Sequence, residues 1–448
     1  MSDADSILVD AVPRSTRGWP SAAPSAQPTT STLDREWDLL LVCTAFYVLT
    51  VVGRVHELFP PLNVVRPAIT TGLLSIILFL TDRLAIRRWK WLSGGPTPWL
   101  LALFGWMLLS IPTALVPGNS FDYVTSEMSK TVLMVFVVAG AIRGPRDLER
   151  IVAAVFYAIA LYAAVVLGRF DLGEGSQWRL GRLYYYDAND FATVAVAVMP
   201  LGVLLAIRAR SWVMRGLPIV ALIVISAVFV RSGSRGGFLA LIASSVFFIL
   251  SFRALSLAGR FAAIGVVAVV ILAAGSERYW TQIGSTFSQT DYNQTDESGR
   301  LQVWQRGLGY VMSNPLFGVG TSNFSVAEGQ LSEMASRQQY GIGVKWSAPH
   351  NMFLQVTAES GIPALVFFVG MLASSFRGFK PAPGQRVRAR RAPVSPVLKQ
   401  ALRASLLGFM VGAFFLSLAY TQLLYVLVAL AVGVHKIERR ALHSPTVS

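Results

Sequence analysis

Long apolar blocks separated by short polar or basic joints are the feature that most constrains the fold of this chain. The blocks are roughly 16–22 residues long, about the length at which a helix crosses a hydrocarbon core of ~30 Å. Hydrophobic residues make up 54% of the 448 residues and charged residues only 14%, which is not the composition of an ordinary soluble domain. We therefore expect an all-α polytopic membrane protein.

About twelve transmembrane helices are predicted from these blocks, and two long polar segments interrupt them. The predicted spans are 38–53, 67–82, 98–116, 129–143, 150–168, 190–207, 216–230, 236–252, 259–275, 353–374, 401–418 and 420–435. The expected organisation is a disordered cytoplasmic tail (1–36), spans one to nine (37–275), one large outer loop containing short helices (276–352), spans ten to twelve (353–440) with a basic cytoplasmic loop (377–399), and a cytoplasmic tail (441–448).

Lysine and arginine residues orient the spans, because positively charged joints stay on the cytoplasmic side during insertion. When the N-terminus is placed in the cytoplasm, every predicted inner joint is basic. Both termini are then cytoplasmic and residues 276–352 are outside. The net charge of +15 is spread over these inner joints, where topology explains it, so we expect no nucleic-acid partner. The single Cys43 excludes a disulfide or a cysteine metal site within one chain.

The remaining basic residues fall on the outer side, which the positive-inside rule depletes. Nearly all of them are arginine, whose planar fork of donors suits carboxylate or phosphate. They indicate an outer-face site for an anionic group, and the alternative is that some anchor helix ends by snorkelling. These residues are Arg54, Arg66, Lys130, Arg169, Arg179, Arg182, Arg231, Arg235, Arg278, Arg300, Arg306, Arg337 and Lys345.

The first outer-face motif is VRSGSRGG, where two predicted spans meet at a short turn. Gly233, Gly236 and Gly237 let the backbone turn tightly, and Arg235 opens the next helix. Free N–H groups at a helix N-terminus and the positive end of its dipole form an anion site, to which Arg235 adds a full charge. The alternative is a tight hairpin with an interfacial arginine.

The second motif, DESGRLQVWQRGLGYVMSNPLFGVG (296–320), lies in the large outer loop. Helical spacing predicts a helix capped by Asp296 or Ser298 and stopped at Asn314-Pro315. Arg300 is expected at the edge of its apolar face, toward a cleft against the membrane, and Arg306 on the opposite, solvated side. An amphipathic helix lying on the bilayer surface is the alternative. The predicted apolar face consists of Leu301, Trp304, Leu308, Val311 and Met312.

The third motif, KWSAPHNMFLQVTAESG (345–361), passes from a polar loop into an apolar helix. Ser347 and Pro349 predict a helix start, with His350 and Asn351 in its first turn at the membrane edge. Neutral imidazole accepts a proton near neutral pH, so His350 is a candidate general base, although a lone interfacial histidine is often structural. Glu359 falls on the opposite helical face and is expected to support another helix rather than His350.

A fourth feature, GRLYYYDANDFATVAVAV (181–198), lies at the outer start of a predicted span. Aromatic residues next to Asp and Asn suit sugar stacking and hydrogen bonds to hydroxyl groups. Tyrosine is also common at membrane interfaces, so this segment leaves both interpretations open.

Taken in order, SRGG, a long outer loop with R…W…NPLFGVG, and PHN…ESG leading into a span resemble the O-antigen ligase and polymerase superfamily, over about residues 180–375. The resemblance implies a GT-C-like, metal-independent glycosyltransferase of the bacterial inner membrane, with its active site on the periplasmic side and no cofactor. The implied donor is a glycan linked through diphosphate to undecaprenol. The implied acceptor is a hydroxyl of lipid A core or of a second lipid-linked glycan, within a surrounding of membrane lipids.

By motif, the resemblance implies catalytic roles for Arg235, Arg300 and His350. The arginines would stabilise the leaving diphosphate, and His350 would orient or deprotonate the acceptor hydroxyl, which attacks C1 with inversion. Ala188 stands where the family has proline. The implied substrate-binding residues are Arg235, Arg300, Arg182, Asn189, Asn351 and Trp304, and no metal ligand is implied.

Three members of this chemistry remain open: a ligase, a polymerase and a protein O-oligosaccharyltransferase, which share the donor and differ in the acceptor. The alternative from another class is a secondary transporter, since twelve spans with both ends inside is also a common transporter plan. Transporters place their sites near the membrane midplane, often between broken helices. The outer-face cluster of arginines and His350 favours the transferase.

Overall fold

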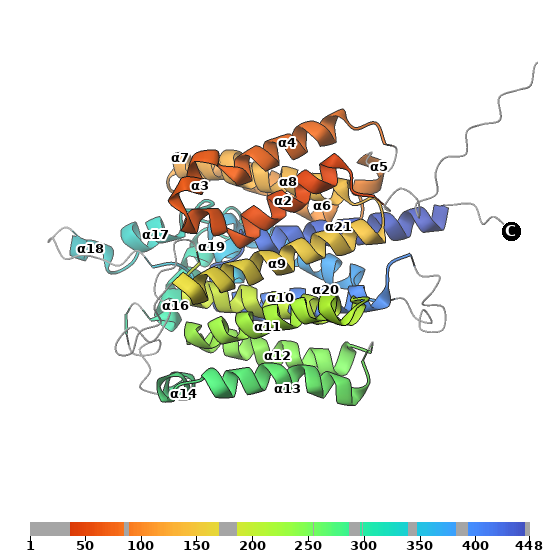
Figure 1. Cartoon of the computed structure of the whole chain (residues 1–448). Coiled ribbons are helices and arrows are strands. Elements are labelled where there is room, and N and C mark those ends of the chain that lie inside the picture. The colour runs from red at the N-terminus through yellow and green to blue at the C-terminus, as the bar shows by residue number, and fades with distance from the viewer. Residues whose placement is uncertain are drawn as a thin grey trace, which may run out of the picture.

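The computed structural model describes residues 36–84, 89–169, 186–253, 255–285, 296, 297, 299–338, 347–381 and 393–443. Within these ranges every regular element is a helix, as the apolar blocks predict. The long helices run alongside one another, and α14, α16, α17 and α18 gather at one end of the bundle (Figure 1). The predicted N-terminal tail, except its last residue, lies outside the described residues, as do Arg182 and 382–392 of the basic loop.

Each predicted span coincides with most of one long helix. These are α2 (Leu39–Gly53), α4 (Pro67–Thr81), α6 (Thr97–Ser110), α8 (Ser129–Ala141), α9 (Pro145–Arg169), α10 (Ala188–Arg208), α11 (Trp212–Ser232), α12 (Arg235–Ser251), α13 (Leu257–Ala274), α19 (Met352–Gly378), α20 (Pro396–Ala413) and α21 (Gln422–His443). The short elements are η1 (Val55–Leu58), α3 (Pro60–Val65), α5 (Trp89–Leu92), η3 (Ile111–Thr113), α7 (Pro117–Asp122), the π-helical η4 (Tyr123–Met128), α14 (Glu277–Gly284), α16 (Arg300–Ser313), α17 (Phe324–Gln330) and α18 (Ala335–Gln338).

Six helical stretches in the described part of the chain are long and apolar enough to cross a membrane. Together they identify a helical membrane protein, whereas the count of twelve spans stays a prediction. The six stretches are Pro117–Ala141, Pro145–Gly168, Ala188–Arg208, Trp212–Ser232, Leu257–Ala274 and Met352–Gly378. Four further apolar helices are shorter, namely Leu39–Gly53, Pro67–Thr81, Thr97–Thr113 and Arg235–Ser251.

Short polar side chains set where many of these helices begin. An Asp or Ser directly before the helix accepts a hydrogen bond from a backbone N–H of the first turn, which that turn cannot satisfy itself. The capping residues are Asp38 for α2, Asp187 for α10, Ser211 for α11, Ser234 for α12, Ser256 for α13 and Ser276 for α14.

Lys436 directly follows the last predicted span, 420–435, and the positive-inside assignment counts it among the basic residues of the cytoplasmic side. It lies within α21 and is completely buried. Its Nζ donates to the backbone oxygens of Ala139, at 2.5 Å, and Gly140, at 3.2 Å. A buried ammonium is stable here because it binds carbonyls that the last turn of α8 leaves without intrahelical partners.

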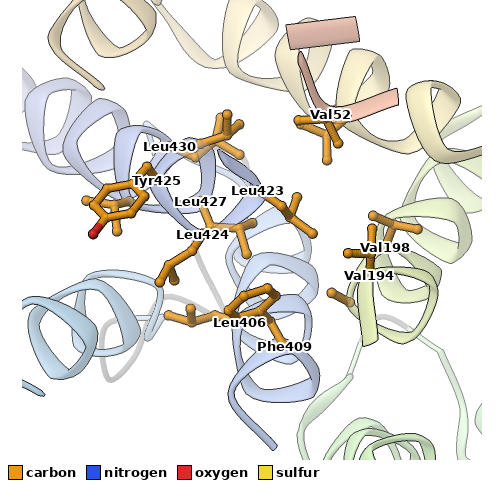
Figure 2. Packing of buried hydrophobic residues seen from close by; sticks show 14 of the residues in the cluster. Val52, Val194, Val198, Leu406, Phe409, Leu423, Leu424, Tyr425, Leu427 and Leu430 are labelled. Carbon is orange, nitrogen blue, oxygen red and sulfur yellow. The ribbon is translucent and has the colours of Figure 1, made fainter. Parts of the chain in front are cut away.

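Small residues bring α10, α12 and α20 close together. A Cβ added at Gly237 of α12 would lie 2.6 Å from the Cβ of Ala192 in α10, and one added at Gly412 of α20 would lie 2.5 Å from the Oγ1 of Thr193. Without a hydrophobic driving force in lipid, such close backbone approach is a main source of helix–helix attraction. Next to these helices, leucine side chains of α21 project toward α20 and α10 (Figure 2).

Two of the predicted apolar spans are interrupted. The interval 401–418 is helical only as far as Ala413, and residues 414–421, here named the α20–α21 segment, form turns. Helix α19 breaks at Gly361, whose φ of 85° and ψ of 174° lie in a region that essentially only glycine adopts. The α20–α21 segment contacts two residues predicted to form the site, His350 and Trp304.

We expect Gly361→Ala to lower the free energy of unfolding by about 3 kcal/mol, because the new Cβ would be strained at this φ and ψ and would lie 1.9 Å from the Leu316 oxygen. Gly378→Ala is the matched control at the other end of α19, where a Cβ meets nothing within 4 Å. Thermal unfolding in detergent measures both. Equal unfolding temperatures for the two variants would contradict this account of the break.

Candidate active site

Arg235 is the first residue of α12, at the turn that the sequence singled out. Gly233 takes the left-handed conformation (φ 57°) that ends α11, and Ser234 caps α12 by accepting from the Gly237 N–H at 3.1 Å. The half-buried Arg235 donates from Nη1 to the Ser285 Oγ, at 3.3 Å, directly after α14. The turn therefore combines a helix N-terminus with a guanidinium held by a neighbouring helix.

Asn189 lies in the first turn of α10, close to this turn. Ala192, one turn further along the same face, packs against Gly237 of α12. Asp187 accepts from the backbone N–H groups of Asn189, at 2.7 Å, and Asp190, at 2.8 Å. The start of α10 is thus fixed beside the start of α12, and Asn189 remains a candidate substrate-binding residue.

His350 stands outside the helix that the sequence predicted to contain it. Asn351 is the N-cap, accepting from Phe353 N at 2.9 Å and Leu354 N at 3.0 Å, so α19 begins only at Met352. The expectation that His350 and Asn351 lie in the first turn was wrong, because the Asn351 amide supplies the cap itself.

The backbone of His350 takes an uncommon conformation. Its φ of 44° is in the left-handed region, which residues other than glycine seldom adopt. The His350 N–H donates to the Ser417 Oγ at 2.9 Å, and the side chain is half-buried. Strained backbone of this kind persists where surrounding contacts impose it, and it gathers at functional sites.

Helix α16 is anchored beside His350 through Trp304. The Trp304 Nε1 donates to the Pro349 oxygen at 2.9 Å, and its ring meets Phe414 edge-on with centroids 5.8 Å apart. Arg300, four residues before Trp304 on the same helix, is half-buried and lies on the same face. The bond from Trp304 to Pro349, the residue before His350, therefore holds the helix that carries Arg300 next to His350.

The buried face of α16 differs from the predicted one. Val303, Gly307, Tyr310 and Val311 are buried, and Trp304 is half-buried. Leu301, Leu308 and Met312 of the predicted apolar face are exposed on the chain, with 80% of Met312 accessible. The cap was also wrong, because Gly299 precedes the helix with no side-chain capping bond. Apolar spacing misled the prediction because a glycine and a tyrosine form the contact surface with α19 and α17.

The sequence predicted that Arg306 is solvated. In the structure it binds a buried carboxylate instead. The Glu328 side chain is completely buried, and Arg306 contacts it through Nη2 at 2.6 Å and Nε at 3.0 Å. The Tyr310 hydroxyl donates to the same carboxylate at 2.8 Å. The bond to Glu328 raises the pKa of Arg306 above its ordinary value. This network ties α16 to α17 and assigns Arg306 a structural role.

The two glycine-containing motifs NPLFGVG and ESG meet at the break in α19. Val319 N donates to the Ala358 oxygen, Gly320 N to the Glu359 oxygen and Ile362 N to the Pro315 oxygen, each at 2.8 Å. The carboxylate of Glu359 is buried and accepts from Phe324 N at 3.4 Å. Glu359 thus binds the start of another helix, α17, which agrees with the supporting role that the sequence indicated.

The α20–α21 segment is the common contact of these parts. Phe414 meets the rings of Trp304 and Phe353, while Ser417 binds the backbone of His350. A Cβ added at Gly236, next to Arg235, would lie 3.2 Å from the Cβ of Phe415. The elements that carry Arg235, Arg300 and His350 are therefore arranged around residues 414–421.

Sequence reasoning placed this segment across the junction of two predicted spans, 401–418 and 420–435, and assigned it no role. Its apolar residues, in FFLSLAYT, continue the pattern of α20. The available signal was the group Ser417, Tyr420, Thr421 and Gln422, polar side chains that are unusual in the middle of an apolar block.

Residues 219–369 match the family model described as O-antigen ligase. This stretch of the chain is similar to the O-antigen ligase family. The match contains Arg235, Arg300 and His350, and it confirms the superfamily that the ordered motifs resemble. No curated protein matches the chain. The match extends from α11 into α19, so the N-terminal helices and the α20–α21 segment lie outside it.

We expect Arg306→Met to lower the free energy of unfolding by about 3 kcal/mol, because it leaves the Glu328 carboxylate buried without its cation. Arg337→Met is the matched control, since Arg337 pairs with Glu297 in an exposed ion pair, and water screens such a pair so that it contributes little to stability. Thermal unfolding in detergent compares the two variants. A larger loss for Arg337→Met would contradict the assigned roles.

Proposed function

We propose that this protein is an inverting glycosyltransferase of the O-antigen ligase and polymerase type, moving a glycan from undecaprenyl diphosphate to an acceptor hydroxyl. The observation that carries the proposal is the arrangement of Arg235, Arg300 and His350 around one segment, at the end of the bundle that carries α14 and α16. The family match to residues 219–369 supports it.

The reaction forms one bond and breaks one. The acceptor oxygen bonds to the sugar C1, the bond from C1 to the phosphate oxygen breaks, and its electron pair leaves on the diphosphate. Guanidinium groups at Arg235 and Arg300 would stabilise this charge through charge-assisted hydrogen bonds, and the N-terminus of α12 would add its dipole. The proton of the acceptor hydroxyl would pass to the neutral imidazole of His350.

The other polar and aromatic side chains of the candidate site would position these groups rather than touch the reacting atoms. Trp304 was assigned to the substrate, yet its N–H is bonded to the Pro349 oxygen, so we propose that it holds α16 against His350. Asn351 was also assigned to the substrate. Its side-chain Oδ1 caps α19, so its side-chain amide nitrogen would be the atom that binds a substrate. Asn189 would meet the donor glycan from the start of α10.

The proposed sidedness follows the positive-inside rule, with residues 276–352 on the periplasmic side and both termini in the cytoplasm. The undecaprenyl chain would stay in the bilayer while its diphosphate reaches the arginines at the membrane edge. Three acceptors fit this arrangement: lipid A core, a second lipid-linked glycan and a protein hydroxyl. An experiment with each acceptor therefore distinguishes a ligase, a polymerase and a protein O-oligosaccharyltransferase.

The break in α19 at Gly361 is the one feature that favours a transporter, since broken helices with buried carboxyl groups are common at transport sites. In transporters the freed carbonyls coordinate the ion. Here the oxygens of Ala358 and Glu359 accept from the Val319 and Gly320 backbone, and the Ser360 oxygen accepts from the Trp106 Nε1 at 3.0 Å. These carbonyls already have donors, which supports the transferase.

Transfer by purified protein in nanodiscs, supplied with undecaprenyl-diphosphate oligosaccharide, tests the proposal. We expect Arg235→Ala and Arg300→Ala each to lower kcat by about 10²–10³-fold, and His350→Ala by about 10²–10⁴-fold. The matched control Arg337→Ala removes an exposed outer-loop arginine and should stay within about twofold of the original rate.

The acceptor decides the type of enzyme. Product on lipid A core identifies a ligase, lengthening of the lipid-linked glycan identifies a polymerase, and a glycosylated peptide identifies a protein transferase. An arm with chelator tests metal independence. Unchanged rates for the three variants, or a folded protein that binds no donor, would overturn the proposal.

A further inference from the structure

We propose that a second pocket, separate from the candidate active site, binds one lipid with a phosphate head group. The pocket has a volume of about 740 Å³ and opens between α2, η1, α4, η4, α8 and the start of α21. This volume is within the usual range for small-molecule sites. None of its lining residues lies within 219–369, and Arg235, Arg300 and His350 do not line it.

Three of the unusual outer-side basic residues line this pocket, namely Arg54, Arg66 and Lys130. Arg54 ends α2, and Arg66 directly precedes α4. Figure 1 places α3, which lies between these two arginines in the chain, at the end of the bundle that carries α7 and α17. The basic part of the pocket therefore faces the same side as the candidate active site.

The acidic residues of the pocket do not neutralise this charge completely. The Arg54 Nε donates to Glu57 at 3.0 Å, and the Lys130 Nζ lies 2.9 Å from the Glu127 carboxylate. The exposed Arg66 has no ion pair among the described residues. The guanidinium of Arg66 thus adds a full positive charge next to two ion pairs. A guanidinium in this setting suits a phosphate oxygen.

His56 supplies a neutral polar group to the same part of the pocket. Burial lowers its pKa below the ordinary value, so the imidazole carries no charge at neutral pH. Its Nδ1 is buried and has no hydrogen-bond partner within the described structure. A buried ring nitrogen without a partner is costly unless a ligand or water supplies one.

Backbone conformation supports a site at this position. Arg54 has a φ of 46° and Arg66 a φ of 45°, two of the few described non-glycine residues with positive φ. His350 is another. A left-handed backbone conformation at a bulky residue costs energy. Such conformations occur most often at functional sites, where the surrounding structure fixes the direction of a side chain.

The rest of the pocket is apolar and runs along α4. Val51, Ile69, Leu73, Ile76 and Met134 line it, and Leu73 is 56% exposed on the chain. A soluble anion would make no use of this wall, whereas a lipid would place its hydrocarbon chain against it and its phosphate at Arg66. The chemistry is shared by bilayer phospholipids and polyprenyl phosphates.

The pocket also reaches the segment that organises the candidate site. Thr131 and Gln422 line it and are joined by a hydrogen bond of 3.1 Å. Gln422 is the first residue of α21 and follows the α20–α21 segment directly. A bound lipid therefore touches the residue next to the segment that holds His350.

Native mass spectrometry of the detergent-purified full chain tests the proposal with three probes: phosphatidylglycerol, undecaprenyl phosphate and uncharged diacylglycerol. Arg66→Asn removes the charge and keeps a residue that tolerates left-handed backbone. We expect it to weaken binding of a phosphate-headed probe about fivefold, the loss for one cation at a membrane surface. Arg83→Asn, beyond the other end of α4, is the matched control and should leave binding unchanged.

Leu73→Trp tests the apolar wall, because it fills the pocket from an exposed position without removing charge. We expect it to weaken both phosphate-headed probes, and the more strongly bound of the two identifies the natural source. Arg235→Ala should retain the lipid, which separates this pocket from the donor site and from the proposed transfer reaction. The proposal is overturned if diacylglycerol binds equally well, if Arg83→Asn weakens binding as much as Arg66→Asn, or if Arg235→Ala alone abolishes binding.

Discussion

Backbone N–H and C=O groups inside a bilayer have no water to bind, so a membrane helix can be interrupted only where another part of the protein supplies the missing hydrogen bonds. The candidate active site depends on this constraint. Helix α19 breaks at Gly361, and residues 315–320 of the loop before α19 donate to and accept from its freed groups. The same bonds fasten the outer loop to the bundle and thereby place α16 above the start of α19.

The second interruption has a complementary effect. Helix α20 stops at Ala413, and the eight residues that follow contact helix α16, His350 and the start of α12. Three parts of the chain that are far apart in sequence are positioned by this one segment. Since the segment leads directly into Gln422, the pocket lies next to the segment that organises the candidate site, while the lining residues of the two sites differ.

Much of the site could be predicted from residue types in order along the chain. The SRGG turn, the arginine before tryptophan and the His-Asn pair indicated Arg235, Arg300 and His350, and all three fall within the matched family region. Details of contact were less predictable. The role of Arg306 was wrong because its partner, Glu328, lies 22 residues away on another helix, and no local pattern connects them. The buried face of α16 differs from the predicted apolar face because a glycine and a tyrosine, rather than the larger aliphatic residues, contact the neighbouring helices.

The sequence by itself determined that the chain forms apolar helices in a membrane, approximately where they begin, and which residue types could serve an anionic substrate. These properties follow from local quantities: the length of an apolar block, a capping side chain and the charge of a joint. Only the tertiary structure decided that residues 414–421 join the parts of the site, that Arg54, Arg66 and Lys130 share a pocket, and that Arg306 is structural. Those outcomes depend on contacts between distant segments, which composition and spacing do not encode.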